Sequence, residues 1–378
     1  MEIKILHIIS GLNDGGAESL LFNFLCHSKN NINFVISLKG KGKYGKMIEE
    51  KGIKIFYFNF SFDISLISNF IDLIKLIKKI NPDVVQTWLY HADLLGGCAA
   101  YIANSKNIFW GIHHGSLDKN INKFSTIFVS KINSYLSYFI PKKIIVCADS
   151  SKFLHIKNGF SQKKFITIPN GIDIKKFKRS SKKRAFFRNK INIKSDETLY
   201  GTVARFHPIK DHITLINSIY RLKNAGYKFK YLLVGDKINN KNKLLNELIK
   251  KYRLEETIIL LDKEENISLV MNAIDLHILS SKSEALPMVI LEAMCCGTPC
   301  LSTNVGDIKK LIFDKNLIVE TSNQSELFSA MRFFADSNTK YKKQISISVE
   351  KQIKENYSLE KMTKKYLNLY QKYTISNK

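Results

Sequence analysis

Residues 276–302 of the chain read LHILSSKSEALPMVILEAMCCGTPCLS. Two short apolar runs, Leu276–Ser280 and Thr298–Ser302, predict buried strands, and Val289–Cys296 between them predicts a helix. A strand, a helix and another strand in this order form one unit of a parallel sheet covered by helices. Glu284 then lies in the loop at the carboxyl end of the first strand, where sheets of this kind carry their ligand sites.

The same alternation of strands and helices runs through the whole chain. Further strands are expected at Ile3–Ile9, Phe34–Leu38, Ile53–Phe58, Asp83–Thr87 and Ile108–Ile112 and, later in the chain, at Leu199–Ala204, Tyr231–Val234 and Ile258–Leu261. The pattern pauses in the polar, basic segment Asn170–Lys194. We therefore expect two Rossmann-like α/β domains, residues 1–176 and 195–355, with a linker at 177–194. A last helix, within residues 356–378, follows the second sheet.

The composition is that of an ordinary globular protein, with 378 residues of which 45% are hydrophobic and 24% charged. It includes 59 Lys and Arg against 33 Asp and Glu, and this net charge of +26 indicates an anionic partner. Six scattered cysteines without a CxxC pair are typical of reduced thiols in the cytoplasm. We expect neither a signal peptide nor a membrane-spanning helix, because no clean apolar stretch of about 20 residues occurs.

The positive charge is concentrated in residues 119–194, which hold 19 Lys and Arg but only 2 acids. The same region carries apolar residues at helical spacing, from Ile121 to Phe139. A basic amphipathic helix of this kind can lie on an anionic membrane surface. A helix that faces the core and exposes its lysines would show the same pattern, so both interpretations stay open.

Two predicted helix starts are candidate sites for an anion. Gly15 and Gly16 follow the first strand and open a helix, and glycine lets a phosphate or a sugar approach the backbone closely. Pro287 suits the first turn of the helix after Glu284, and the free N–H groups that follow it would attract a phosphate. Glu292 lies about one turn further on, where its carboxylate could accept both hydroxyls of a ribose.

Glu284 and Glu292 reproduce a spacing of two glutamates, E-x7-E, that retaining glycosyltransferases of the GT-B fold use, and the run Glu284–Pro299 resembles a block of glycosyltransferase family four. Similar segments elsewhere extend the resemblance over nearly the whole chain. They are the glycine loop Gly15–Glu18, the hinge strand Ile168–Asp173, and Gly201–Arg205 with Lys210 after it. Departures from the usual family residues occur at Ala285, Met288 and Asp211, positions that bear on the donor sugar rather than on the nucleotide.

This resemblance implies the GT-B arrangement of two facing Rossmann-like domains, with the C-terminal helix crossing back to the N-terminal domain. The N-terminal domain would bind the acceptor and the C-terminal domain the donor, a UDP- or GDP-linked sugar, with no other cofactor. The implied reaction is metal-independent glycosyl transfer with retention of configuration, to a saccharide that is lipid-linked, in bacterial surface polysaccharide biosynthesis (O-antigen, capsule or exopolysaccharide). The protein would be cytoplasmic and associated peripherally with the anionic inner face of the cell membrane.

The resemblance also implies roles for individual residues. Arg205 and Lys210 would bind the donor diphosphate, Glu284 would contact the donor sugar, and Glu292 would bind the nucleotide ribose. The other donor-binding candidates are Gly15, Gly16, Gly235, Leu286, Pro287, Met288 and Val289. His91 follows the strand at Asp83–Thr87 and is a catalytic candidate, because a related family position holds a histidine near the donor sugar.

The remaining histidines divide into two groups. His113 and His114 follow the strand Ile108–Ile112 at the same sheet edge as His91, and we expect one of them to contact the acceptor or the sugar. The second group is expected to occupy structural or surface positions, and it consists of His7, His27, His155 and His277.

The sequence leaves other functions besides glycosyl transfer to consider. Gly40–Gly45 matches GxGxxG, but it follows the second strand rather than the first, which argues against a dinucleotide site. No Asp-x-Asp occurs, so no metal–diphosphate clamp is expected. A nucleotide-sugar epimerase of similar fold is the alternative enzyme class, although the spacing of Glu284 and Glu292 favours transfer. A basic nucleic-acid-binding protein is a remote alternative, because no compact module of interleaved aromatic and basic residues is present.

Overall fold

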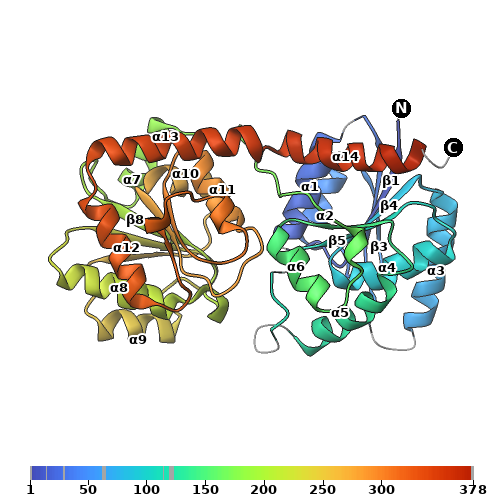
Figure 1. The fold of residues 1–378 in the computed structure, drawn as a ribbon, viewed down its shortest axis with the longest axis horizontal. Helices are drawn as coiled ribbons and strands as arrows, with labels where there is room; N and C mark the ends of the chain where they lie inside the picture. Colours follow the sequence, from blue (N-terminus) through green and yellow to red (C-terminus); the bar gives the residue numbers. More distant parts are fainter. Residues whose placement is uncertain are drawn as a thin grey trace. The chain divides into compact units, whose positions relative to one another are not determined.

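The computed structural model describes residues 2–13, 15–28, 30–61, 65–113, 115–118 and 123–375. The chain divides into two compact units (Figure 1). The first unit comprises Met1–Gly171 together with Leu359–Lys378, and the second comprises Ile172–Ser358. Each unit has its own parallel sheet with helices on both faces, which is the α/β class that the alternating sequence pattern predicts.

The sheet of the first unit has seven strands among the described residues, in the order β3-β2-β1-β4-β5-β6-β7, and all are parallel. Their bounds are β1 Lys4–Ile9, β2 Ile32–Ser37, β3 Lys54–Tyr57, β4 Val84–Trp88, β5 Ile108–Ile112, β6 Lys143–Val146 and β7 Phe165–Thr167. The helices are α1 Gly16–His27, α2 Gly42–Glu49, α3 Ser65–Ile80, α4 Tyr90–Ile102, α5 Phe124–Leu136, α6 Asp149–Lys157 and α14 Leu359–Ile375.

The C-terminal helix α14 is part of the core of the first unit. Tyr366 lies 5.6 Å from Phe24 of α1, and Tyr370 lies 5.1 Å from Phe109 of β5, both measured between ring centroids. Both tyrosines are fully buried, and they belong to the same apolar cluster as β1 and α1. Because two aromatic side chains of this size bury most of their surface there, α14 seals one face of the sheet.

The second unit repeats the architecture with six strands among its residues, in the order β10-β9-β8-β11-β12-β13. Their bounds are β8 Leu199–Val203, β9 Lys230–Val234, β10 Ile258–Leu261, β11 Leu276–Leu279, β12 Cys300–Thr303 and β13 Ile318–Val319. The helices are α7 Ser181–Lys190, α8 His212–Asn224, α9 Lys243–Lys251, α10 Ile267–Ala273, α11 Met288–Cys295, α12 Gln324–Asp336 and α13 Thr339–Asn356.

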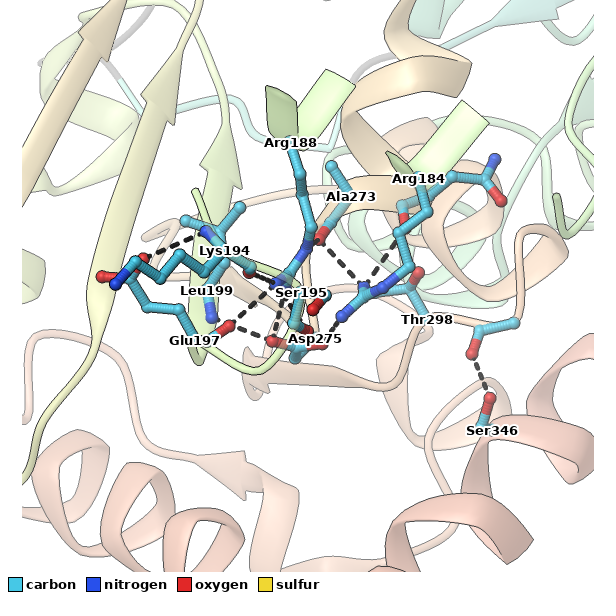
Figure 2. A network of polar contacts seen from close by, with 12 residues as sticks. Arg184, Arg188, Lys194, Ser195, Glu197, Leu199, Ala273, Asp275, Thr298 and Ser346 are labelled. Carbon is cyan, nitrogen blue, oxygen red and sulfur yellow. Dashed lines mark hydrogen bonds and ion pairs between the residues drawn. The ribbon is translucent and has the colours of Figure 1, made fainter. Parts of the chain in front are cut away.

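The segment expected as a linker, residues 177–194, differs from that expectation because it contains helix α7 and lies within the second unit. Figure 2 shows how this basic helix is held. Arg184 and Arg188 both form ion pairs with Asp275, at 2.6 and 2.9 Å, and Arg188 is buried. Lysines and arginines interrupt the apolar pattern of this helix in the sequence. The buried Arg188 is paired with Asp275, which lies far along the chain.

Each sheet has one point where its strand order reverses. In the first unit the chain leaves β1 toward β2 on one side, while β4 lies on the other side of β1. In the second unit β8 and β11 stand in the same relation. The loops that follow two such strands diverge and leave a crevice at the carboxyl edge of the sheet, which is where open α/β folds bind ligands.

Candidate functional site

The reversal point of the second sheet brings together the residues with the strongest chemical signal. Arg205 follows β8, and its side chain is exposed, with no hydrogen bond or ion pair to any described residue. Lys210 ends the 3₁₀ turn Pro208–Lys210, and its Nζ lies 2.5 Å from Oε1 of Glu284, in the loop after β11. The two side chains of this pair are 19% and 17% exposed, so solvent screens their attraction only in part.

Backbone contacts hold these two loops together. The Ser280 hydroxyl donates to the carbonyl of Lys210 at 2.8 Å, and the Lys282 N–H donates to the carbonyl of Ile209 at 2.7 Å. The Ser281 hydroxyl donates to Glu284 Oε1 at 2.7 Å. The carboxylate of Glu284 is therefore fixed between a hydroxyl and an ammonium group, and the position of Lys210 is fixed with it.

Helix α11 starts beside this pair. Pro287 is the residue before the helix, which begins at Met288, one position before the expected start at Val289. Leu286 and Pro287 are buried, whereas Met288 and Val289 are partly exposed. The first N–H groups of the helix have no intrahelical partner, so this terminus can accept an anion.

Glu292 lies in the middle of α11 and is partly exposed. Burial raises the pKa of its carboxyl group from 4.5 to about 7, and the charge of Lys176 opposes this shift. The carboxyl group therefore titrates near neutral pH. A small change in pH converts it between a protonated form and a carboxylate that accepts hydrogen bonds from hydroxyl groups.

Two glycines shape the crevice. At Gly235, after β9, φ is +149° and an added Cβ would lie 2.2 Å from the carbonyl oxygen of Ala204. At Gly306, after β12, φ is +56° and an added Cβ would lie 2.1 Å from the carbonyl oxygen of Ala285. Both glycines are therefore required for the close packing of neighbouring loops. Gly235 is one of the donor-binding candidates expected from the sequence, whereas Gly306 is not among them.

The electrostatic surroundings of Lys210 are positive. Burial and then the charges of Arg205, Lys210 and Lys237 lower the pKa of His207. Burial and then Lys210 lower the pKa of His212 to about 4 and that of His277 to about 3. These histidines are therefore neutral at pH 7, and the positive charge comes from the lysines and Arg205. Lys237 and His207 were not singled out from the sequence, although His207 follows β8 at the reversal point and Lys237 follows the neighbouring strand β9.

At the reversal point of the first sheet, Gly15 and Gly16 lie after β1. Gly15 precedes α1 in an extended conformation, and Gly16 is its first residue. An added Cβ at Gly16 would meet nothing within 4 Å, whereas one at Gly15 would meet the flexible end of Glu18. Packing among the described residues therefore does not require glycine at position 16, and the space beside its backbone is open.

His91 stands in the first turn of α4, across the reversal point from this glycine pair. The N–H of Ala92 donates to the Ser10 hydroxyl at 3.2 Å, which ties the start of α4 to the loop after β1. Burial, followed by the charge of Lys39, lowers the pKa of His91. A neutral, partly exposed imidazole results, which can accept or donate a single hydrogen bond to a hydroxyl group.

His113 follows β5 and stacks on Trp88, with ring centroids 5.5 Å apart and planes 8° from parallel. Its Nε2 is buried and has no hydrogen-bond partner among the described residues, and burial lowers its pKa to about 4. The second candidate of this pair, His114, lies outside the described residues. Trp88, which the sequence analysis did not single out, is thus the element that positions His113.

A strained residue and a buried acid support this edge. Leu89, directly before α4, has a φ of +74°, which is unusual for a residue with a branched side chain. The N–H of Asp93 donates to the carbonyl of Leu89, and the hydroxyl of Thr87 donates to Asp93 Oδ1 at 2.5 Å. Asp93 is fully buried, and this burial raises its pKa well above the usual value. These contacts hold the Leu89 turn, and with it His91, in place.

The remaining histidines of the sequence analysis have structural positions. His7, His155 and His277 are fully buried, and His27 is exposed on the surface of α1. His7 accepts from Trp88 Nε1 at 3.3 Å and pairs with Asn33 at 3.2 Å. Both ring nitrogens of His7 are thus occupied, and His7 supports Trp88.

The GxGxxG segment also has a structural explanation. An added Cβ at Gly42 would lie 2.3 Å from the backbone of Leu12, and the N–H of Tyr44 donates to the Leu12 carbonyl at 2.9 Å. Gly42 therefore lets the start of α2 pack against the loop after β1.

A cavity of 1130 Å³ lies elsewhere in the second unit, near Lys178, Asp275 and Lys342. It opens at the amino ends of β8 and β11, close to the Arg184–Asp275 network of Figure 2 and on the opposite edge from Glu284. The Arg184 and Asp275 side chains that line it are already paired with each other, and we place the site at the carboxyl edge despite the size of this cavity.

Within the described ranges, no group of three or more His, Cys, Asp or Glu residues could hold a metal ion. Of the helices in the same ranges, none combines the length and apolar content that crossing a bilayer requires.

Two parallel sheets, each with a reversal point, and a lysine–glutamate ion pair at one of these points are features of an α/β transferase of the GT-B fold. Family models agree with this class: "Glycosyltransferase Family 4" matches residues 33–176, and "Glycosyl transferases group 1" matches residues 183–351. The chain belongs to this glycosyltransferase family, with one model falling in each unit, and it is an enzyme that transfers a sugar.

Curated relatives and solved structures give the same picture. The chain is 25% identical to a putative glycosyltransferase, EpsF, of Bacillus subtilis (strain 168), over 79% of this chain and 78% of that protein. It is also 25% identical to a UDP-Gal:alpha-D-GlcNAc-diphosphoundecaprenol alpha-1,3-galactosyltransferase of Escherichia coli, over 84% of each chain. The crystal structure of Anabaena HepE with UDP-glucose superposes with a TM-score of 0.85 at 19% identity, over 98% of this chain and all of that one, which shows the shared fold.

Proposed function

We propose that this enzyme transfers a hexose from a UDP- or GDP-linked donor to a lipid-linked saccharide, with retention of configuration and without a metal ion. The observation that carries the proposal is the cluster at the β8–β11 reversal point. There Arg205, Lys210 and the start of α11 supply positive potential, and Glu284 and Glu292 supply acceptors for hydroxyl groups. A diphosphate attached to a ribose and a sugar needs this combination of groups.

The slow step in such a transfer is the departure of the nucleoside diphosphate from an oxocarbenium-like sugar. Negative charge grows on the leaving phosphate, and a fixed cation contributes most when it stabilises charge that develops at that moment. Arg205 is exposed and has no partner among the described residues, so it can bind a phosphate without breaking another contact. We assign it the larger share of this stabilisation.

Lys210 has a second task, because it is already paired with Glu284. When a diphosphate binds, Lys210 can direct its charge toward the phosphate, and Glu284 becomes free to accept a hydroxyl of the donor sugar. The Ser281 hydroxyl keeps Glu284 in place during this exchange. The pair therefore couples the arrival of the phosphate to the preparation of the sugar contact.

Retention of configuration requires that the acceptor reaches the same face of the sugar from which the diphosphate leaves. We propose front-face attack, in which the C–O bond to the diphosphate breaks, the acceptor oxygen bonds to the same carbon, and the leaving phosphate oxygen takes the acceptor proton. His91 is neutral and lies at the edge of the first sheet, so it suits a hydrogen bond to a sugar hydroxyl rather than charge stabilisation. We propose a similar sugar or acceptor contact for His113, and backbone contacts to the donor for Gly15 and Gly16.

The name of the Escherichia coli relative supports the nature of the acceptor, since that protein acts on a diphosphoundecaprenol-linked sugar. Other relatives include an O-antigen biosynthesis glycosyltransferase, WclY, and a capsular polysaccharide biosynthesis glycosyltransferase, CapH. We propose a step of surface polysaccharide assembly for this chain, at the cytoplasmic face of the cell membrane.

A panel of nucleoside diphosphates and nucleotide sugars tests the proposal. One of them should raise the melting temperature, because a ligand at about 100 times its Kd adds about 2.7 kcal/mol of stability. The stabilising nucleotide sugar should then support transfer in the presence of EDTA. Loss of activity with EDTA and its rescue by Mn²⁺ would contradict the metal-independent mechanism, whereas stabilisation by no member of the panel would contradict the donor site.

A further inference from the structure

Helix α5 is turned with its aromatic residues outward. Phe124, Phe128, Tyr135 and Phe139, the last just past the helix end, follow one another at intervals of four, seven and four residues, which places them on one side of the helix. Their exposed fractions are 84%, 57%, 70% and 62%. We call these four residues the aromatic stripe.

The opposite side of α5 is buried, and it is mostly polar. Ser130, Asn133 and Ser134 face the unit together with Val129, and the Asn133 side chain donates to the carbonyl of Tyr90 at 2.9 Å. The helix packs against α4 on the outside of the first unit (Figure 1). Of the two interpretations left open by the sequence, the one in which this helix turns its apolar residues to the core is therefore wrong for the aromatic residues.

The stripe is accompanied by lysines. Lys131 is exposed in the middle of it, and beyond its end a cavity of 500 Å³ is lined by Phe139 and Tyr101 together with Lys106, Lys142 and Lys164. Burial, followed by the charges of Lys142 and Lys143, lowers the pKa of Lys164. Residues 123–164 contain eight lysines and one acid. Like charges gathered in this way favour an anion among them.

We propose that the aromatic stripe and the lysines at its end form a docking surface for an anionic phospholipid bilayer. The helix is too polar on its inner side to insert, but it can lie in the interface with its aromatic rings among the lipid headgroups. Each lysine near an anionic surface adds up to about 1 kcal/mol of attraction, which fades with salt. Isolated exposed apolar side chains are common, whereas a continuous stripe marks an interaction surface.

The inference rests on the proposed function only in that a membrane-bound acceptor gives the docking a purpose. Lipid binding and sugar transfer can be measured separately. Loss of vesicle binding with normal transfer to a water-soluble acceptor analogue would leave the transferase in place, and loss of transfer with normal vesicle binding would leave the docking surface in place.

The test is co-sedimentation of the full chain with vesicles of phosphatidylcholine alone or with one third phosphatidylglycerol, at low and high salt. The wild type should bind only the anionic vesicles and should be released by salt. The variant Phe124→Ser/Phe128→Ser should bind the anionic vesicles at least about tenfold more weakly than the wild type. The variant Lys131→Glu/Lys142→Glu should also bind them only weakly. Because all four side chains are exposed, folding should be unaffected, which circular dichroism can verify.

Matched controls are Phe186→Ser/Phe313→Ser and Lys241→Glu/Lys250→Glu, which change exposed residues of the second unit. These variants should bind vesicles as the wild type does. Equal binding by the stripe variants and the wild type, or no binding of the wild type to anionic vesicles at low salt, would overturn the proposal. A concentration-dependent dimer in sedimentation velocity that the Phe124→Ser/Phe128→Ser change abolishes, without any vesicle binding, would assign the stripe to a second copy of the chain instead.

Discussion

The carboxyl edges of the two sheets share a topology and differ in chemistry. At the edge of the second unit, Arg205, Lys210 and Glu284 are charged, and burial lowers the pKa of the histidines around them. At the edge of the first unit, the described candidates are glycine backbone and two histidines whose pKa burial lowers. The first edge therefore suits neutral hydroxyl groups, and the second suits a diphosphate.

This difference shows what the fold does and does not decide. The reversal of strand order places a crevice at the carboxyl edge of either sheet. The side chains at the ends of β1, β4, β8 and β11 then determine which ligand each crevice can accept. Charge-removing changes in the second unit should therefore alter phosphate binding and catalysis, and changes in the first unit should alter only the sugar step.

The largest expected effect is that of Arg205→Ala. Turnover should fall by about 10²–10³-fold, because a preorganised cation at the leaving group is lost. Stability should hardly change, since Arg205 is exposed and has no partner in the described part of the chain. Steady-state kinetics with the donor found in the panel would measure this, with Lys241→Ala, an exposed lysine in the loop after β9, as the control. Wild-type turnover in Arg205→Ala would remove the diphosphate role from this residue.

A second pair of changes separates a structural glycine from a functional one. Gly235→Ala should lower the free energy of unfolding by about 2–3 kcal/mol, because its Cβ would lie 2.2 Å from the carbonyl oxygen of Ala204. Gly16→Ala should leave stability within about 0.5 kcal/mol, because the space around it is open, but should weaken donor use about tenfold. Denaturant unfolding and kcat/KM would measure the two effects. If Gly16→Ala is fully active, the backbone of the first unit does not approach the donor.

The smallest effect concerns Glu292 and depends on pH. Its folded pKa of about 7 lies above its ordinary value of 4.5, so protonation stabilises the folded state below pH 4.5 and this contribution is lost as pH rises through 7. Glu292→Gln has no carboxyl group to ionise, so the variant does not lose this stability as pH rises. The variant should therefore be more stable than the wild type by about 1–2 kcal/mol at pH 8 and nearly equal at pH 5, and it should bind the donor more weakly at pH 8. Denaturation at both pH values would test this; a variant less stable at pH 8 would contradict the raised pKa of the Glu292 carboxyl group.

Much of the architecture could be predicted from the sequence, because buried parallel strands are short apolar runs. The strands from β1 to β5 and from β8 to β12 fall within a few residues of their expected places. Helix α7 could not be predicted in this way, since Arg184 and the buried Arg188 are held by Asp275 and by the carbonyl of Ala273, which are distant in the chain. The orientation of α5 was also hidden, because its buried face depends on small polar residues that pair with α4.

The candidate site could be located from the sequence but not assembled from it. The spacing of Glu284 and Glu292 places both near one helix start, and the contact of Lys210 with Glu284 follows only from the adjacency of β8 and β11. Gly306 and Trp88 escaped attention because nothing in their local sequence marks them. Their importance comes from the backbone of Ala285 and from the ring of His113, which only the folded chain brings near.

Calorimetric titration of UDP and GDP into the full chain and two variants tests the central claim most directly, because it measures phosphate binding without turnover. The account predicts that Arg205→Ala binds the preferred nucleotide at least tenfold more weakly than the wild type, about 1.4 kcal/mol. His91→Ala should bind it within twofold of the wild type while transferring sugar more slowly. Equal losses of nucleotide affinity in both variants, or no loss in Arg205→Ala, would contradict the division of chemistry between the two edges.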